Sequence, residues 1–120
     1  MQYQRFYLSN KKYKDYNLLS NTIDDAAGEA FDKGARLLGL PYPGGPEIEK
    51  LAKDGDLSKF KFPIAKIKDS ENNFSFSGLK TSLYYLIKNN DKGMIDDNKH
   101  HIAASYQETI LETLIQKIVL

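Results

Sequence analysis

The stretch that decides the fold is "NTIDDAAGEAFDKGARLLGLPYPGGPEIEKLAKDGD", residues 21–56. Apolar residues recur with a 3.6-residue period over residues 23–38, which predicts a helix. Thr22 can cap the start of this helix, and Gly39 is the residue type that most often ends one. The loop "PYPGGP" follows, and Pro46 is suited to the first turn of a second, short helix. The stretch therefore predicts two helices joined by a tight loop.

The segments on either side of these helices favour extended structure. Residues 2–9 alternate loosely and are rich in aromatic side chains, which predicts a strand. Residues 11–19 would form the second arm of a short N-terminal β hairpin. Residues 55–73 predict a loop with short extended pieces, because "FKFP" and "NFSFSG" alternate aromatic with polar residues.

The C-terminal part of the chain favours helices. One is predicted over "GLKTSLYYLIKN", with Ser77 as its N-cap. The polar segment "NNDKGMIDDN" is interpreted as a connection, and a last helix is predicted from Lys99 to the C-terminus. The apolar stripe that predicts this last helix is Ile102, Tyr106, Ile110, Leu114 and Ile118.

Composition excludes several classes of protein. The chain has 120 residues, enough for one small domain with a single core. Seventeen Lys and Arg residues against sixteen Asp and Glu give a net charge of +1, so composition alone does not indicate nucleic-acid binding. The absence of cysteine excludes disulfides and thiolate metal sites. No apolar run reaches the roughly 18 residues of a membrane span, and no signal-peptide pattern is present. We expect a soluble, cytoplasmic chain.

Three acidic residues share one face of the first predicted helix. Asp25, Glu29 and Asp32 are spaced by four and three residues. One interpretation is an ordinary solvated face, because Glu29 can pair with Lys33 and Asp32 with Arg36 at the favourable four-residue spacing. The other interpretation is one wall of a ligand site.

Gly28 favours the ligand site, and the proline-rich loop is compatible with it. A glycine inside a helix costs roughly 1 kcal/mol relative to alanine, and it often marks a close approach by backbone or ligand. A carboxylate beside such an opening can accept hydrogen bonds from sugar hydroxyls. The loop "PYPGGP" offers backbone N–H groups that can face a phosphate or ribose. The same chemistry also suits a plain connector between helices, so both interpretations stay open.

Two other patterns have simpler explanations. "SGLK", from Ser77 to Lys80, has the Ser-x-x-Lys spacing of penicillin-binding proteins, but the companion motifs of those enzymes are missing. His100 and His101 are adjacent, so a helix points them in different directions and they do not form a metal-binding pair. We interpret Ser77 as a helix cap and both histidines as surface residues.

Three motifs in order are more specific than any one of them: "TIDDAAGEAFDKGARLLGLPYPGGPEIEKLAKDGD", "FSFSGLKT" and "IAASYQETILETLIQK". Together they resemble the central part of the TsaD family, the tRNA adenosine threonylcarbamoyltransferases. Archaeal and eukaryotic relatives of this family belong to the KEOPS complex, and the family was formerly described as O-sialoglycoprotein endopeptidases or glycoproteases. The resemblance covers nearly all of residues 13–117.

The resemblance implies an α/β chain that is part of an actin-like ATPase fold, mostly helical with the short N-terminal hairpin. It implies transfer of threonylcarbamoyl from threonylcarbamoyl-adenylate to N6 of the adenosine 3′ of the anticodon, in tRNAs that read codons beginning with A. The implied partners are tRNA and, in bacteria, TsaB-like and TsaE-like proteins. A divalent metal of the iron or zinc type is implied to help hold the adenylate.

The resemblance assigns substrate-binding roles to particular residues. Asp32 in "GEAFDK" is implied to bind the nucleotide part of the adenylate. Gly45, the second glycine of "YPGGP", is implied to approach the same ligand, and Glu29 is a weaker candidate. No catalytic residue and no metal ligand is assigned to this chain.

The sequence also departs from the family's pattern. Family members carry a "GGHTQ"-type motif where this chain has "YQRF", residues 3–6. The upstream His-x-x-x-His metal ligands, the phosphate-binding hairpin and the later "GGVAAN" loop are missing. We therefore expect residues 1–120 to be a partial domain, a fragment that carries one wall of the site and is inactive alone. The alternative is a non-catalytic nucleotide-binding or assembly module that complements a separately encoded remainder. A peptidase has no nucleophile–base pair to support it.

Overall fold

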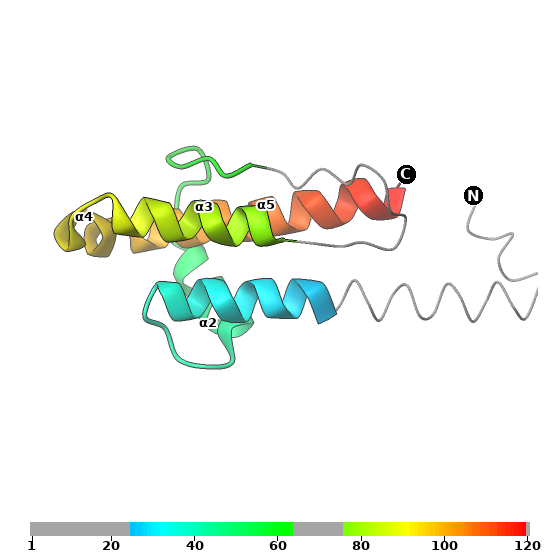
Figure 1. Cartoon of the computed structure of the whole chain (residues 1–120), viewed down its shortest axis with the longest axis horizontal. Helices are drawn as coiled ribbons and strands as arrows, with labels where there is room; N and C mark the ends of the chain where they lie inside the picture. Colours follow the sequence, from blue (N-terminus) through cyan, green and yellow to red (C-terminus); the bar gives the residue numbers. More distant parts are fainter. Residues whose placement is uncertain (1–24, 64–75, 120) are drawn as a thin grey trace, which may run out of the picture.

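The computed structural model describes residues 25–63 and 76–119 of the chain. These two ranges are mostly helical and contain no strand (Figure 1). The predicted hairpin over residues 2–19 and the Thr22 cap lie outside the described residues. No helix within the described ranges is long and apolar enough to cross a membrane. The helices are a first helix over residues 25–37, α2 (Gly44–Ala52), α3 (Ser77–Lys88), α4 (Lys92–Asp97) and α5 (Lys99–Val119).

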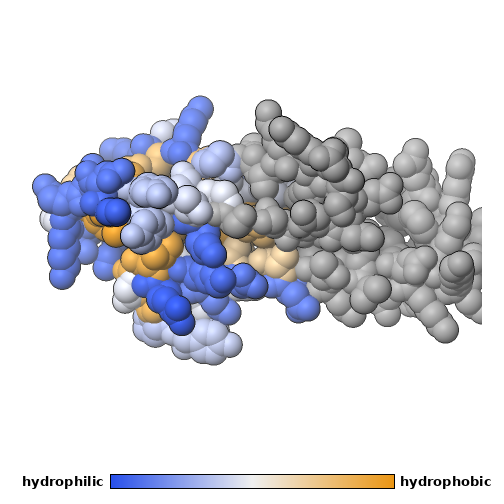
Figure 2. All heavy atoms as spheres, viewed as in Figure 1, coloured by the Kyte–Doolittle hydropathy of each residue, from blue (hydrophilic) through white to orange (hydrophobic). Residues whose placement is uncertain are grey.

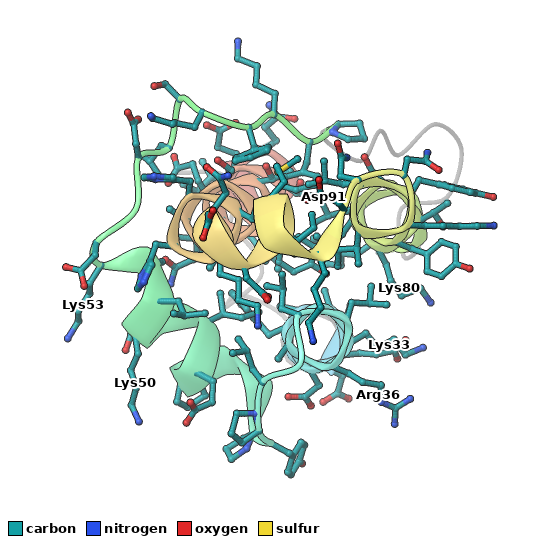
Figure 3. The ribbon with its side chains drawn as sticks, turned by 90° about the vertical axis from the view of Figure 1, so that its left-hand side faces the viewer. Lys33, Arg36, Lys50, Lys53, Lys80 and Asp91 are labelled. Atoms are coloured by element: carbon teal, nitrogen blue, oxygen red, sulfur yellow. The ribbon has the colours of Figure 1, made fainter. Side chains whose placement is uncertain are left out.

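The long helix α5 lies at the centre of the core. The four-residue spacing of its stripe predicts one buried face, and Ile102, Tyr106 and Ile110 are indeed fully buried. α5 packs against α2 and α4, and Figures 1 and 3 both place α3 beside it. Each of the neighbouring helices contributes apolar side chains to the same cluster, such as Ile48 from α2 and Leu83 from α3. The predicted last helix is confirmed, and its stripe is buried from Ile102 to Ile110. Leu114 is half-buried, and the Ile118 side chain lies outside the described residues.

Tyr106 anchors the first helix to α5. Its side chain is 0% exposed, and its hydroxyl donates a hydrogen bond to the Ala30 carbonyl at 2.7 Å. Its ring meets the ring of Phe62 edge-on, with 5.8 Å between centroids. Gly34 makes room for the tyrosine, because a Cβ at that position would collide with the ring. Burial also raises the pKa of Tyr106.

The connection from the first helix to α2 uses the predicted glycine. Gly39 has a φ of 77°, in the left-handed region that glycine tolerates best. The N–H of Leu40 then donates to the Ala35 carbonyl at 2.8 Å, which closes the helix end. α2 begins at Gly44, so Pro46 lies in its first turn as the sequence predicts.

The end of α2 and the loop that follows it are held against α5 by the two adjacent histidines. The Asp56 N–H donates to Nδ1 of His101 at 2.9 Å. Nδ1 of His100 lies 3.1 Å from the Leu51 carbonyl oxygen. His100 is exposed and His101 is half-buried, so both lie near the surface as expected. Their contacts with distant backbone groups give them a structural role that the sequence did not indicate.

Two of the sequence predictions about helices are wrong. α3 begins at Ser77, and the N-cap position belongs to Phe76, which makes no side-chain capping bond. The predicted polar connection between α3 and α5 contains α4. The Asp91 side chain caps α4 by accepting a hydrogen bond from the Met94 N–H at 2.6 Å, and Ile95 is buried. One cap and one buried apolar side chain are enough to stabilise this short turn of helix inside a packed structure.

Candidate functional site

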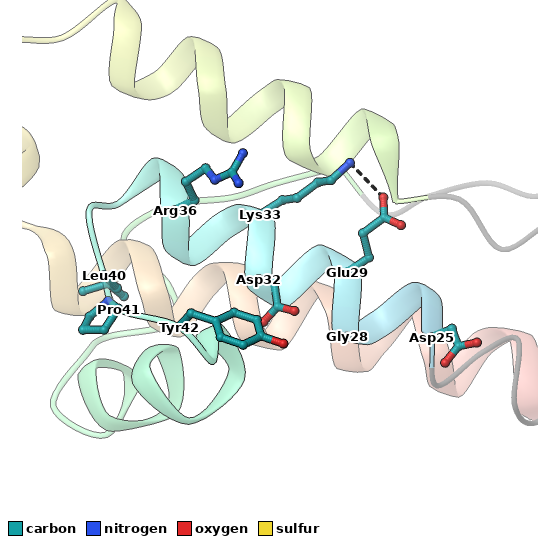
Figure 4. A pocket seen from close by; sticks show the side chains of 9 residues that line it. All are labelled: Asp25, Gly28, Glu29, Asp32, Lys33, Arg36, Leu40, Pro41 and Tyr42. Atoms are coloured by element: carbon teal, nitrogen blue, oxygen red, sulfur yellow. Dashed lines mark ion pairs between the residues drawn. The ribbon is translucent and has the colours of Figure 1, made fainter.

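An open hollow of about 730 Å³ lies where the "PYP" part of the loop returns to the outer face of the first helix (Figure 4). The helix contributes a charged wall and the loop contributes a mostly apolar edge, on which Tyr42 is 82% exposed. The two stretches that the sequence singled out therefore meet at one place. The lining residues are Asp25, Gly28, Glu29, Asp32, Lys33, Arg36, Leu40, Pro41 and Tyr42.

Asp32 joins the two parts of the hollow. Its Oδ1 accepts a hydrogen bond from the backbone N–H of Gly44 at 2.9 Å. α2 has no side-chain cap of its own, because Pro43 occupies its N-cap position. The Asp32 carboxylate takes that place from the neighbouring helix, where the positive end of the α2 dipole favours it. The predicted ion pair between Asp32 and Arg36 does not form among the described residues.

Glu29 forms the ion pair that the sequence predicts. Its carboxylate lies 2.9 Å from the Lys33 ammonium, four residues further along the helix (Figure 4). The hydrogen bond from Lys33 and the charge of Lys33 lower the pKa of Glu29. The same hydrogen bond raises the pKa of Lys33. Both side chains are at the surface, so this pair contributes little to stability.

The glycines of the site differ in what surrounds them. Gly28 is exposed, and a Cβ there would meet nothing within 4 Å in the described part of the chain. The close approach occurs instead at Gly44, where a Cβ would lie 2.6 Å from the Phe31 carbonyl oxygen. Gly45 is half-buried beside it, does not line the hollow, and has ordinary space for a methyl group. The sequence singled out Gly28 and Gly45 and missed Gly44.

No group of three or more His, Asp or Glu side chains within the described ranges is arranged to hold a metal ion. Two of the three carboxylates that line the hollow have other partners, since Asp32 accepts from Gly44 and Glu29 pairs with Lys33. The arrangement can instead accept hydrogen bonds from hydroxyl groups, and it can offer cations at its rim.

Comparison with known proteins places this chain in a family. The profile of the family described as "TsaD: tRNA N6-adenosine threonylcarbamoyltransferase" matches residues 4–119. The chain belongs to the TsaD family. Membership implies the actin-like ATPase fold, of which the described residues supply helices. The matched range includes Glu29, Asp32 and Gly45.

Curated relatives in the TsaD family are about 50% identical to this chain over most of its length. A relative from Thermosipho africanus is 51% identical over 107 residues, which are 89% of this chain and 32% of the relative. One from Anaeromyxobacter sp. is 52% identical over 109 residues, 88% of this chain and 31% of the relative. One from Dichelobacter nodosus is 51% identical over 112 residues, which are 92% of this chain and 32% of the relative. All three are named tRNA N6-adenosine threonylcarbamoyltransferase, and the chain spans about a third of their length.

Proposed function

We propose that this chain forms one wall of the substrate site of a tRNA N6-adenosine threonylcarbamoyltransferase. In this reaction N6 of the adenosine 3′ of the anticodon attacks the carbamoyl carbon of threonylcarbamoyl-adenylate. The bond from that carbon to the phosphate oxygen breaks, N6 loses a proton, and AMP leaves. Family membership and the names of the relatives support this reaction for the whole enzyme. Because the chain spans about a third of those relatives, the activity requires segments beyond the ones that this chain supplies.

The position of Asp32 is the observation that carries the proposal. The carboxylate lines the hollow, and its hydrogen bond with Gly44 fixes its orientation there. A fixed carboxylate can accept a hydrogen bond from a ribose hydroxyl without losing further side-chain entropy. We assign to Asp32 the binding of the nucleotide part of threonylcarbamoyl-adenylate.

Gly45 and Glu29 have supporting roles in the proposal. Gly45 lies in the first turn of α2, next to the residue that Asp32 holds, and without a side chain it leaves its backbone open to the same ligand. Glu29 lines the hollow one helical turn before Asp32. Lys33 already uses part of the hydrogen-bonding capacity of the Glu29 carboxylate, which makes Glu29 the weaker candidate for binding the substrate.

The divalent metal of the iron or zinc type that the family implies does not fit the described residues. They contain no cluster of three or more potential ligands, and the two carboxylates that line the hollow beside Gly28 have other partners. We therefore derive no step through a metal in this chain. The proposed partners are the tRNA substrate and TsaB-like and TsaE-like proteins, and a tRNA substrate implies the cytoplasm.

Ligand binding to the 120-residue chain tests the proposal. We would titrate a non-hydrolysable analogue of threonylcarbamoyl-adenylate into ¹⁵N-labelled protein and follow the amide resonances. We expect shifts at Asp32, Gly44 and Gly45, and at least about tenfold weaker binding in the Asp32→Asn variant, because a charged hydrogen-bond acceptor is lost. Asp25→Asn is the matched control, since Asp25 lines the same hollow on the same helix. Equal weakening by both substitutions would contradict the role of Asp32.

A further inference from the structure

A stripe of positive charge runs along α3. Lys80, Tyr84 and Lys88 are spaced by four residues, so they lie on one face of the helix and span about 12 Å of its axis. The helix "SGLKTSLYYLIK" contains no acidic residue. The two lysines of this stripe therefore have no acidic partner on α3 itself.

The stripe continues to the rim of the hollow. Lys33 and Arg36 line the hollow on the side that faces α3 (Figure 4). Lys33, Arg36 and Lys80 point to the same side of the molecule, whereas Lys50 lies on a different side (Figure 3). Lys80 is close enough to contribute, after Lys33, to the lowered pKa of Glu29. The cations of the two helices therefore form one surface.

Aromatic rings lie among these cations. Tyr84 and Tyr85 are 45% and 50% exposed, and their centroids are 5.3 Å apart in an edge-on arrangement. The Lys88 ammonium is 5.8 Å from the centre of the Tyr84 ring. Core packing does not account for such exposed rings. The face that carries α3 and the first helix is largely hydrophilic, with small apolar areas, which argues against a lipid surface as its partner (Figure 2).

We propose that Lys80, Tyr84 and Lys88 bind a single-stranded RNA loop, with the lysines on phosphates and the Tyr84 ring stacked on an unpaired base. Exposed aromatic rings between cations are the usual surface for unpaired nucleotides. Arg36 extends the phosphate contacts to the hollow. This inference rests on the proposed function, since the loop that carries the acceptor adenosine must reach an adenylate bound in the hollow.

Salt dependence gives this proposal a quantitative test. We would measure binding of a fluorescein-labelled RNA stem–loop, with an anticodon-type loop, to the full 120-residue chain by anisotropy. Three phosphate contacts, from Arg36, Lys80 and Lys88, predict a slope of about −2 for log affinity against log salt between about 50 and 200 mM. The Lys80→Gln/Lys88→Gln variant should bind roughly tenfold more weakly, with a slope reduced by about 1.4.

Two further variants distinguish RNA binding at this surface from a general effect of the chain's positive charge. Lys50→Gln/Lys53→Gln removes the same charge from the end of α2, and its affinity should match that of the parent chain. Tyr84→Leu should bind about tenfold more weakly with an unchanged salt slope, because stacking releases no counterions. Helical circular dichroism confirms that each variant folds as the parent does.

Three results would overturn the proposal. They are equal losses in the two double-lysine variants, an unchanged affinity in Tyr84→Leu, and binding of polyglutamate or anionic vesicles as tight as that of RNA. The adenylate analogue keeps the two proposals distinguishable. It should bind the Lys80→Gln/Lys88→Gln variant normally, and the RNA loop should bind Asp32→Asn normally. Failure of one assay alone therefore contradicts only the proposal that it tests.

Discussion

The Asp32 carboxylate accepts a hydrogen bond from the Gly44 N–H at 2.9 Å, across twelve residues of sequence. This contact joins the acidic face of the first helix to the start of α2. It explains why the aspartate and the double glycine occur together, because one caps the helix that the other begins. The same contact fixes the carboxylate that we assign to the substrate, so a structural and a binding role share one side chain.

Substitutions at Asp32 should separate these two roles. Asp32→Ala removes the cap of α2 and should lower the free energy of unfolding by about 1–2 kcal/mol. Asp32→Asn keeps an oxygen that can accept from Gly44, so its loss should be below about 1 kcal/mol. Urea denaturation measures both values. Equal losses for the two variants would mean that charge, and not the hydrogen bond, holds this junction.

The two adjacent glycines of the loop should respond differently to alanine. A Cβ at Gly44 would lie 2.6 Å from the Phe31 carbonyl oxygen and 2.8 Å from the Asp32 Cα, and backbone atoms cannot easily move aside. Gly44→Ala should therefore destabilise the chain by about 1–3 kcal/mol. At Gly45 the nearest atom is 3.9 Å away, so Gly45→Ala should change stability by less than about 1 kcal/mol. Its effect should appear in weaker binding of the adenylate analogue. Thermal unfolding of the two variants checks the order.

The contact between Tyr106 and the first helix should make a measurable contribution to stability. Tyr106→Phe removes the hydrogen bond to the Ala30 carbonyl and should cost about 1 kcal/mol. Gly34→Ala should cost about 1–3 kcal/mol, because its Cβ would displace the buried ring. Tyr106→Phe should not relieve that second cost, since the ring itself remains. If Tyr106→Phe and Gly34→Ala together lower the free energy of unfolding by less than about 0.5 kcal/mol, this packing is contradicted.

The Glu29–Lys33 pair predicts a pH dependence at the rim of the hollow. Lys33 lowers the pKa of Glu29 below 4.5, so the contribution of Glu29 to stability is present above pH 4.5 and is lost as pH falls through the lowered value. Glu29 raises the pKa of Lys33 above 10.5, so the contribution of Lys33 is present below pH 10.5 and is lost as pH rises through the raised value. An NMR titration of the Glu29 carboxyl should show the depression, and Lys33→Met should remove most of it, because only the smaller effect of Lys80 then remains. A Glu29 carboxyl that titrates at or above 4.5 in the parent chain would show that the pair is absent in solution.

Local patterns were sufficient for the longer helices. The 3.6-residue period and Gly39 predicted the first helix and its end, and the stripe through Tyr106 predicted α5. α4 was missed because its signals are one Asp cap and one buried isoleucine, Ile95, within a charged segment. Such a short helix depends on tertiary packing more than on its own sequence.

The candidate site shows the limit of spacing rules more clearly. The four-residue rule correctly paired Glu29 with Lys33, and it wrongly paired Asp32 with Arg36. The partner that Asp32 has is a backbone N–H brought back by the loop, which no local rule identifies. For the same reason the sequence pointed to Gly28, where the described chain leaves open space, and missed the packed Gly44.

A hybrid enzyme tests the central claim most directly. Residues 4–119 of this chain would replace the matching third of the Thermosipho africanus relative, and transfer of labelled threonylcarbamoyl from the adenylate to tRNA would be measured. We predict that the hybrid transfers the group and the 120-residue chain alone does not. Asp32→Asn in the hybrid should lower transfer at least about tenfold, while the matched Asp25→Asn hybrid stays active. Transfer by the chain alone at the rate of the hybrid, or full activity of a folded Asp32→Asn hybrid, would contradict the claim.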